Sequence, residues 1–489
     1  MRHSFSACFL LSIATLVSAA PDPKRPQDSL TDTAPGVATL EPVARISDKR
    51  IDECSGLAYA GGAFWANNDS GSDAVLYRST KADFANAEAF EVPGADAIDW
   101  EDLAVLDGDI LACDTGDNGR KRESVTVYRV RYLAATDDKP ARVERLATYP
   151  IRYPDGAHDA EGCCVIDGKL HIVVKNRGEA STSVFRVDEL KDAKDLAGGF
   201  NKPVSVGELE LEAGDQVTAA DYDAETGTIV LLTYYHLLQY KKERFSGKPL
   251  KSTLLAARQC EALCFHGKQL VFTNEQRDVF AIDDYLARDY ASMLPILGEA
   301  SLPLVKDTFE IDGTGDAWAN FRAEVPLQHR LEDEHLRWLI AGDKLLLQAR
   351  LRYRGDFQSS REANGSLGSG LILMFGKDRT LELGKQEVQI AIGDNGQTGI
   401  DCWRMDLTGD ALKLKPLAGC KFKGSVKGGV FEFETAIELK SIFGEMTPDS
   451  FMFNALGWTL HGPTEVQFSG QDHMALFRPY IWGEVTIRK

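Results

Sequence analysis

The chain has 489 residues, of which 74 are Asp or Glu and 55 are Lys or Arg, so its formal net charge is −19. No cluster or stripe of Lys and Arg stands out, which argues against nucleic acid and anionic membranes as partners. The length exceeds what a single hydrophobic core usually serves, so we expect two domains.

Residues 1–19 have the pattern of an export signal. Arg2 and His3 form a basic start, Ala7 to Val17 is an apolar run, and Val17-Ser18-Ala19 is a small-residue cleavage site. The apolar run is too short for a permanent membrane anchor, so we expect no membrane insertion. Residues 20–38 are rich in Pro, Asp and Thr, which predicts a flexible lead-in. The mature protein is therefore expected to be exported, periplasmic or extracellular.

One phrase recurs five times between residues 50 and 270, at intervals of 42 to 60 residues. Each copy has an acidic or small residue, a short apolar strand, a tight turn, a second apolar strand and a polar loop. The equivalent positions are Ser55, Glu101, Glu161, Ala219 and Glu261. Such a period predicts an all-β fold, a five- or six-bladed β-propeller over residues 39–304. A sixth blade would combine residues 39–50 with 280–304.

In a propeller blade, the start of the innermost strand and the loop after the second strand lie on the same face. Here that face carries many polar side chains, whereas the opposite hairpin turns are bland. The candidates for ligand binding on this face are Asp69, Arg120, Lys175, Arg177, Asn274, Glu275 and Arg277.

Three glutamates begin the innermost strands and are expected to converge on the propeller axis: Glu101, Glu161 and Glu261. Like charges that close cannot all stay ionised without a partner, and a calcium ion, which takes six to eight oxygens, would resolve the repulsion. Asp114 and Asp117 offer further oxygens in a neighbouring loop. The alternative is a structural latch, in which the glutamates accept hydrogen bonds from backbone amides of the next blade.

Catalytic motifs are scarce in the sequence. It contains no G-x-S-x-G nucleophile elbow, no H-E-x-x-H zinc motif and no P-loop. His158 and His236, with Glu161, are the candidates for moving protons on the polar face. Whether the protein is an enzyme stays open at this point.

After Leu302 the repeat ends and a different pattern begins. About eight strand-like segments over residues 305–489, many alternating apolar and polar residues, predict a β-sandwich. Removal of Cys8 with the signal would leave eight cysteines, an even number that permits disulfides in an oxidising compartment. Cys402 and Cys420 are the only two in this second half, so we expect them to pair.

The second half resembles family 9 carbohydrate-binding modules and their DOMON-like relatives. The resemblance rests on the opening Asp312-Gly313, Asp316 and Trp318, the strand L-x-x-Q-A-R-L, and the strand from Phe433 to Leu439. It implies two aromatic rings that sandwich a sugar, for which Trp403, Trp458 and Trp482 are candidates, and calcium that stiffens loops.

The first half resembles exported propellers of the SdiA-regulated and esterase-like phytase kind. The resemblance rests on Ser55-Gly56-Leu57, Glu161-Gly162-Cys163 and Glu261-Ala262-Leu263, which match the phrases that begin blades in those proteins. It implies the propeller fold rather than an activity, since propellers host many chemistries.

Two functions follow as expectations. The first is an exported binding protein that recognises a saccharide or cell-envelope ligand on one propeller face, with calcium as stabiliser and the sandwich assisting. The second is a metal-assisted hydrolase or lyase acting on a glycan or phosphate ester. A scaffold whose ring binds another protein is a third possibility.

Overall fold

The computed structural model describes residues 36–176, 180–212, 215–257, 259–294, 299–305, 318, 324–325, 327, 333–353, 369–376, 387–394, 400–406, 413–418, 420–427, 429–445, 447–459, 462–467 and 482–488. The predicted export signal, and most of the predicted lead-in, lie outside these residues. The described chain is nearly all-β and divides into two units, one spanning Pro35–Leu294 and the other containing Pro295–Lys489.

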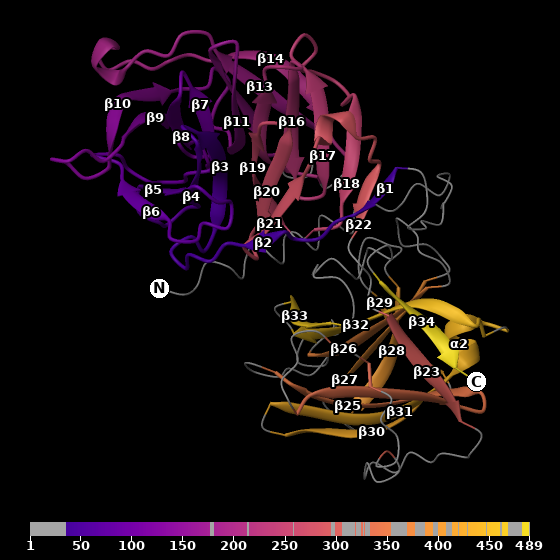
Figure 1. Ribbon diagram of the computed structural model, residues 1–489. Coiled ribbons are helices and arrows are strands. Elements are labelled where there is room, and N and C mark those ends of the chain that lie inside the picture. The colour runs from indigo at the N-terminus through magenta and orange to yellow at the C-terminus, as the bar shows by residue number, and fades with distance from the viewer. Residues whose placement is uncertain are drawn as a thin grey trace. The chain divides into compact units, whose positions relative to one another are not determined.

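The first unit has a propeller-like arrangement with four four-stranded blades (Figure 1). Three of them use strands that follow one another along the chain: β3 (Cys54–Ala60), β4 (Ala63–Asn68), β5 (Val75–Ser79) and β6 (Glu88–Glu91); β7 (Asp102–Leu106), β8 (Asp109–Asp114), β9 (Val125–Leu133) and β10 (Arg142–Ile151); β11 (Ala160–Ile166), β12 (Lys169–Val174), β13 (Ser181–Val187) and β14 (Val204–Glu210). The fourth contains β19 (Cys260–His266), β20 (Gln269–Asn274), β21 (Asp278–Ile282) and, from the start of the chain, β2 (Ala44–Arg45).

A larger, six-stranded sheet stands with these four blades. It contains β15 (Val217–Asp223), β16 (Thr228–Thr233), β17 (His236–Lys241) and β18 (Lys251–Leu255), extended by β22 (Ser292–Leu294) and β1 (Val37–Thr39). The innermost strands β3, β7, β11, β15 and β19 contact one another in this order, and β19 contacts β3.

This arrangement corrects the predicted count of five or six like blades. The segments assigned to a sixth blade join existing sheets instead. Ala44 pairs with Val279 in the β19 sheet, whereas Val37 pairs in parallel with Ser292 in the six-stranded sheet. These short segments add to existing sheets because the edge strand of a sheet offers hydrogen-bond partners to their backbone N–H and C=O groups.

Four of the five innermost strands have a β-bulge near their start. The register with the second strand shifts by one residue at Ser55, Glu161, Thr218 and Glu261. A bulge of this kind re-aims a side chain next to the ladder. In the six-stranded sheet the bulged residue is Thr218. The position equivalent to the glutamates is therefore Thr218, and the prediction of Ala219 was wrong by one residue.

Two aspartates tie neighbouring sheets together, one of them, Asp102, buried. Oδ2 of Asp102, on β7, accepts hydrogen bonds from the backbone N–H groups of Cys163 and Ala220, at 2.8 and 3.1 Å. Oδ2 of Asp221, on β15, accepts one from the N–H of Phe265 at 2.7 Å. The structure therefore has the latches that the sequence suggested as an alternative, but Asp102 on β7 and Asp221 on β15 make them in place of the glutamates.

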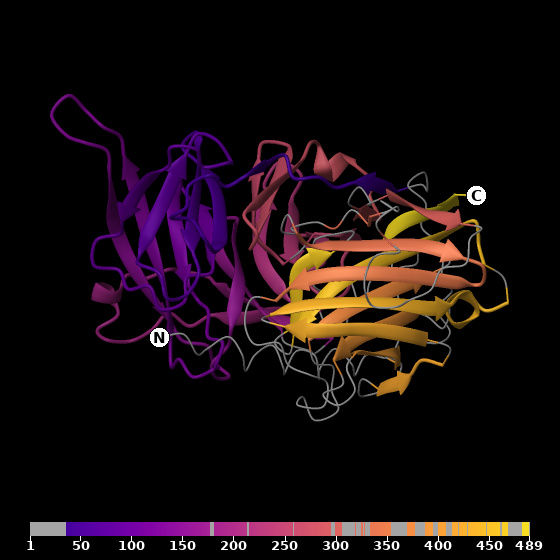
Figure 2. The ribbon, with the colours of Figure 1, turned by 90° about the horizontal axis from the view of Figure 1, so that it is seen from below.

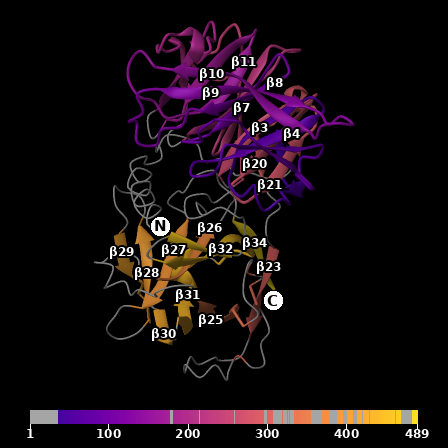
Figure 3. The same ribbon diagram turned by 90° about the vertical axis from the view of Figure 1, so that its left-hand side faces the viewer.

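The second unit contains a twelve-stranded sheet that folds into two layers (Figures 2 and 3). One layer contains β29 (Lys413–Pro416), β28 (Ile400–Asp406), β27 (Val388–Asp394), β26 (Gly370–Gly376), β32 (Ser450–Thr459), β33 (Gly462–Gln467) and β34 (Gly483–Arg488). The other contains β24 (His335–Ala341), β25 (Lys344–Arg352), β31 (Val430–Glu438) and β30 (Cys420–Lys427), and β23 (Glu299–Val305) pairs with both layers. A short helix, α2 (Leu439–Phe443), follows β31.

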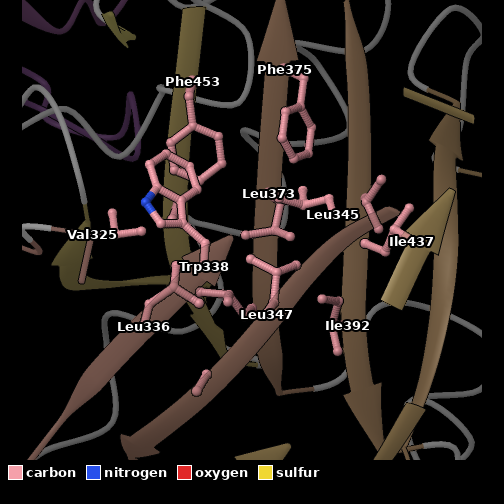
Figure 4. Packing of buried hydrophobic residues seen from close by; sticks show 14 of the residues in the cluster. Val325, Leu336, Trp338, Leu345, Leu347, Leu373, Phe375, Ile392, Ile437 and Phe453 are labelled. Atoms are coloured by element: carbon pink, nitrogen blue, oxygen red, sulfur yellow. The ribbon is translucent and has the colours of Figure 1, made fainter. Parts of the chain in front are cut away.

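Apolar side chains from the two layers meet in one core. Trp338 packs against Phe453 with ring centroids 4.7 Å apart, and Leu345, Leu373 and Phe375 lie beside them (Figure 4). The alternating pattern of the strands explains this arrangement, because every second side chain of a strand faces the same side. Within the described residues, no helix has the length and apolar character needed to cross a membrane.

Candidate functional site

Five carboxylates from three successive blades meet on the polar face of the propeller unit. We name them the acidic cluster: Asp69, Asp99, Glu101, Asp159 and Glu161. Asp69 follows β4, Asp99 and Glu101 precede β7, Asp159 precedes β11, and Glu161 is the bulged residue of β11. The cluster thus depends on the packing of neighbouring blades, since its members are far apart along the chain.

The acidic cluster contains two overlapping groups of three carboxylates. In the first, Asp69, Asp99 and Glu101 each offer an oxygen, and these oxygens lie within 4.8 Å of one another. In the second, Glu101, Asp159 and Glu161 do the same. Glu101 belongs to both groups. The hydroxyl of Ser55 donates a hydrogen bond to its Oε2 at 3.0 Å.

One ammonium group pairs with the cluster. Lys175 lies directly after β12, and its Nζ donates to Oε1 of Glu161 at 2.6 Å, with both side chains buried. The same Nζ lies 5.1 Å from the ring centroid of Tyr234. The carboxylates of Glu161, Glu261 and Glu101 outweigh the burial of Lys175 and hold its pKa well above the usual range.

Asp114, Asp117 and Arg122 lie behind the acidic cluster and hold its members in place. The carboxylate of Asp114 accepts a hydrogen bond from the Asp99 N–H at 2.9 Å and another from the Arg122 guanidinium at 2.8 Å. Asp117 accepts the Arg122 N–H at 2.6 Å, and the Asp117 N–H donates to Asp159 at 2.8 Å. Asp114 and Asp117 therefore lie behind the cluster and position it, and neither belongs to the two groups of three.

Glycine is required at position 116 for the cluster to assemble. A Cβ there would stand 2.2 Å from Oε1 of Glu101 and 2.7 Å from Cγ of Asp99. The missing side chain therefore leaves the space that these two carboxylates fill.

Oxygen Oδ1 of Asp99 is buried and has no hydrogen-bond partner, although the residue is 7% exposed. A buried carboxylate oxygen without a partner costs free energy unless something else contacts it. Burial, with the charges of Asp69 and Asp159, raises the pKa of Asp99 to about 6. Burial also raises the pKa of Glu161 to about 7, against the opposing effect of Lys175. For Glu101, burial and the charge of Glu161 hold the pKa well above its usual range.

An all-oxygen set with an orphaned buried oxygen fits a hard divalent cation. Calcium accepts six to eight oxygens at flexible geometry, whereas magnesium demands a near-ideal octahedron. The five members of the acidic cluster are the residues that would hold such an ion. Glu261 lies outside both groups of three. Its charge helps to raise the pKa of Lys175, and burial together with the charge of Glu161 raises the pKa of Glu261 itself.

The two histidines named as proton carriers have different surroundings. The His158 ring pairs with Asp155 at 2.9 Å and packs against Tyr153 and Phe185 at 5.0 Å, an arrangement suited to a structural residue. The Nδ1 atom of His236 lies 2.6 Å from Oδ2 of the buried Asp215, which orients the imidazole.

The remaining ligand-binding candidates are spread over the unit. Arg120 is exposed at a positive φ of 49°, and Arg177 lies outside the described residues. Arg277 donates to the backbone oxygens of Ile46 and Asp48 at 2.7 and 2.9 Å, so it fastens the segment beside β2. Asn274 exchanges hydrogen bonds with Asp278, and Glu275 accepts one from Gln259 at 2.8 Å.

In the second unit, the tryptophans differ in exposure. Trp318 and Trp482 are buried, at 1% and 0% exposed, so neither presents a flat ring to a sugar. Trp403, on β28, is half-buried, and the side chain of Trp458, on β32, lies outside the described part of the chain. Trp403 therefore stays the candidate ring.

None of the eight described cysteines forms a disulfide, so the expected bond between Cys402 and Cys420 is absent. Both sulfurs instead contact the hydroxyl of Thr435, at 3.6 and 3.1 Å. The Thr435 hydroxyl thus lies between two cysteines that come from different layers.

Sequence reasoning did not count four of the residues that shape the cluster among its site candidates. Asp99 and Asp159 are members of the cluster. Arg122 binds Asp114 behind it, and the Tyr234 ring faces Lys175. The repeat contained a signal for the first two, because each stands two residues before a named glutamate. Arg122 and Tyr234 lie in loops of differing length, where no repeat position predicts a contact.

Comparisons with known proteins leave the family of this chain unassigned. No family model matches the chain, and no curated protein matches it. Among solved structures, a family 9 carbohydrate-binding module from Caldicellulosiruptor kristjanssonii in complex with cellotriose is similar at 12% identity and a TM-score of 0.29, covering 39% of this chain and 93% of that one. The computationally designed Ika8 protein is similar at 10% identity and a TM-score of 0.24, covering 80% and 98%. At these scores the likenesses carry no functional argument.

Proposed function

We propose that this protein is a calcium-dependent binding protein whose propeller face recognises a saccharide or another hydroxyl-rich ligand. The observation that carries the proposal is the acidic cluster, in which two groups of three carboxylates share Glu101 and one buried oxygen of Asp99 has no partner. The sandwich, with Trp403, would assist binding as the sequence resemblance implies. Export follows only from residues 1–19 and stays a prediction.

The chemistry of the cluster favours a cation over other occupants. Its donors are carboxylate oxygens, and the only described ammonium in contact with it pairs with Glu161. Asp69 adds its charge to the burial that raises the pKa of Glu53, so the negative field extends beyond the cluster. A divalent ion would neutralise this field and contact the orphaned oxygen of Asp99.

Ligand recognition would use the ion's open coordination positions. Calcium takes more oxygens than three carboxylates supply, so water or ligand hydroxyls fill the rest. Asp69 is half-buried, unlike the four buried members of the cluster, so the ligand would approach from the Asp69 side. Two neighbouring hydroxyls of a sugar ring can replace two waters there.

Calorimetric titration of chelator-treated protein with calcium, together with thermal melting, tests the cation. We expect heat of binding and a higher melting temperature with calcium. Glu101→Gln should abolish both, because Glu101 serves both groups of three. Glu91→Gln, which changes an exposed glutamate on β6, is the matched control and should behave like the native protein.

The ligand is tested separately on a panel of neutral and acidic glycans, with calcium or with chelator. Calcium-dependent binding of one glycan class would support the proposal. No heat of binding and no shift in melting temperature with calcium would refute it, since the acidic cluster would then be a purely structural group.

The second candidate is a metal-assisted hydrolase or lyase that acts on a glycan or phosphate ester. The observation that favours it is the Asp215–His236 pair at 2.6 Å, which has the form of an oriented general base. Release of product from glycan or phosphate-ester substrates, lost in both His236→Gln and Glu161→Gln, would select this function. Ligand binding without product release selects the binding protein.

A further inference from the structure

The side chain of Lys175 occupies one end of the acidic cluster as a cation of the protein itself. Its Nζ is bonded to Glu161 at 2.6 Å, and the side chain is 8% exposed, so solvent supplies little screening. Glu161 is at the same time a member of the group with Glu101 and Asp159. One carboxylate thus serves both the ammonium and the group that would hold a divalent ion.

The carboxylates around Lys175 come from more than one blade. Glu161 is the bulged residue of β11, and Glu261 is the bulged residue of β19. Both act on the Lys175 ammonium through their charge, and the Tyr234 ring closes another side at 5.1 Å. Glu161 is therefore paired with an ammonium, whereas Asp99 at the other end keeps a buried oxygen without a partner.

We propose that Lys175 is a tethered counter-cation that occupies Glu161 and confines divalent cations to the part of the acidic cluster around Asp69, Asp99, Glu101 and Asp159. Without the ammonium, the group of Glu101, Asp159 and Glu161 forms an additional position for calcium. This inference rests on the proposed function, because it assumes that the cluster takes divalent cations.

The physical reason is competition for the same carboxylates. An ammonium on a side chain is present at every cation concentration, so it stabilises the cluster when calcium is absent. It also repels a second divalent ion at short range, because like charges in a buried site are weakly screened. The lysine would therefore limit how many ions bind, and the cluster would keep part of its order in calcium-free solution.

The test compares Lys175→Met, which keeps the length and loses the charge, with Lys175→Arg, which keeps the charge. Calcium bound per chain is measured by equilibrium dialysis, and the melting temperature is measured with calcium and with chelator. We expect Lys175→Met to bind one more calcium per chain than the native protein, and its melting temperature to depend more strongly on calcium. Lys175→Arg should match the native stoichiometry.

A second variant keeps the test valid if Lys175→Met folds only in calcium. The double variant Lys175→Met/Glu161→Gln removes both partners of the ion pair, so the charge stays balanced while a ligand of the additional position is lost. It should bind no more calcium than the native protein. If Lys175→Met and the native protein bind equal calcium with equal affinity, the inference about Lys175 is wrong and the proposed function stands.

Two other results separate the two claims. If the native protein binds no calcium but Lys175→Met does, Lys175 fills the cation position and the proposed calcium dependence is wrong. If neither protein binds calcium, both claims are refuted.

Discussion

Asp102 accepts a hydrogen bond of 2.8 Å from the backbone N–H of Cys163, in the neighbouring blade. The same oxygen accepts another from Ala220, on β15, so one buried carboxylate holds strands from three sheets together. The residue directly before it, Glu101, is the shared member of the acidic cluster. Structural fastening and the candidate site are therefore adjacent along the chain, and substitutions can separate them.

Replacing Asp102 with Asn should destabilise the propeller unit. Asp102 accepts backbone N–H groups on both oxygens, those of Cys163 and Ala220 on Oδ2 and that of Leu103 on Oδ1. Asn has one acceptor oxygen, so its NH2 group would face one set of these buried N–H donors. Each unsatisfied buried group costs about 1–3 kcal/mol, so we expect a loss of about 2–5 kcal/mol in the free energy of unfolding by urea. Asp137→Asn, at an exposed turn, is the control and should stay within about 0.5 kcal/mol. An equally small effect at Asp102 would show that the latch contributes little.

The metal-free protein should lose stability as the pH rises from 5 to 8. Burial raises the pKa of Asp99 and of Asp221 to about 6 in the folded chain, whereas an unfolded aspartate titrates near ~3.9. Each carboxyl binds its proton more tightly when folded. Its contribution is therefore complete below the unfolded pKa and is lost as the pH rises through the folded one.

The expected loss is about 1–2 kcal/mol per such carboxyl over this range. Urea unfolding in chelator at pH 5 and pH 8 measures it. Asp99→Asn removes one of the titrating groups and should show a smaller difference between the two pH values. A variant with the same pH dependence as the native protein would mean that Asp99 titrates normally.

Substituting Gly116 with Ala should impair the candidate site more than the fold. The new methyl group would collide with Glu101 and Asp99, and the displaced carboxylates would no longer surround one cation. Loss of a supporting residue around a metal typically weakens binding about 10–100-fold, which is the decrease we expect for calcium in calorimetry. Gly119→Ala is a matched control, because the nearest atom there is 3.5 Å away on the flexible Lys121 side chain. Equal calcium affinities in the two variants would contradict the geometry.

Of the eight described cysteines, at most one should react with a thiol reagent in the native protein. Seven of the eight described cysteines are buried, and Cys420 is half-buried. Burial also raises the pKa of Cys54 to about 12, so its reactive thiolate is scarce. We expect Cys420→Ser to remove the native reactivity, and urea to expose the remaining thiols. Rapid reaction of several cysteines without denaturant would contradict the described burial.

Several features of the fold were predictable from local pattern. The turn and two apolar strands of each repeat predicted the hairpins, because alternation with a period of two needs no distant information. The polar residues at the start of the innermost strands predicted a polar face for the same reason. The count of blades was not predictable, since Val37–Thr39 and Ser292–Leu294 pair with each other and with a sheet that begins at Val217.

The sequence of this protein therefore contains its β-strands, its acidic face and the identity of Glu101 and Glu161 as candidates. The packing of neighbouring blades determined the rest, because it brings Asp69, Asp99 and Asp159 beside those glutamates from three blades. A one-residue bulge selected Thr218 over Ala219 in the six-stranded sheet. The position of a bulge depends on the register between strands, and the membership of the cluster depends on which blades are neighbours. The spacing of residues along one strand predicts neither.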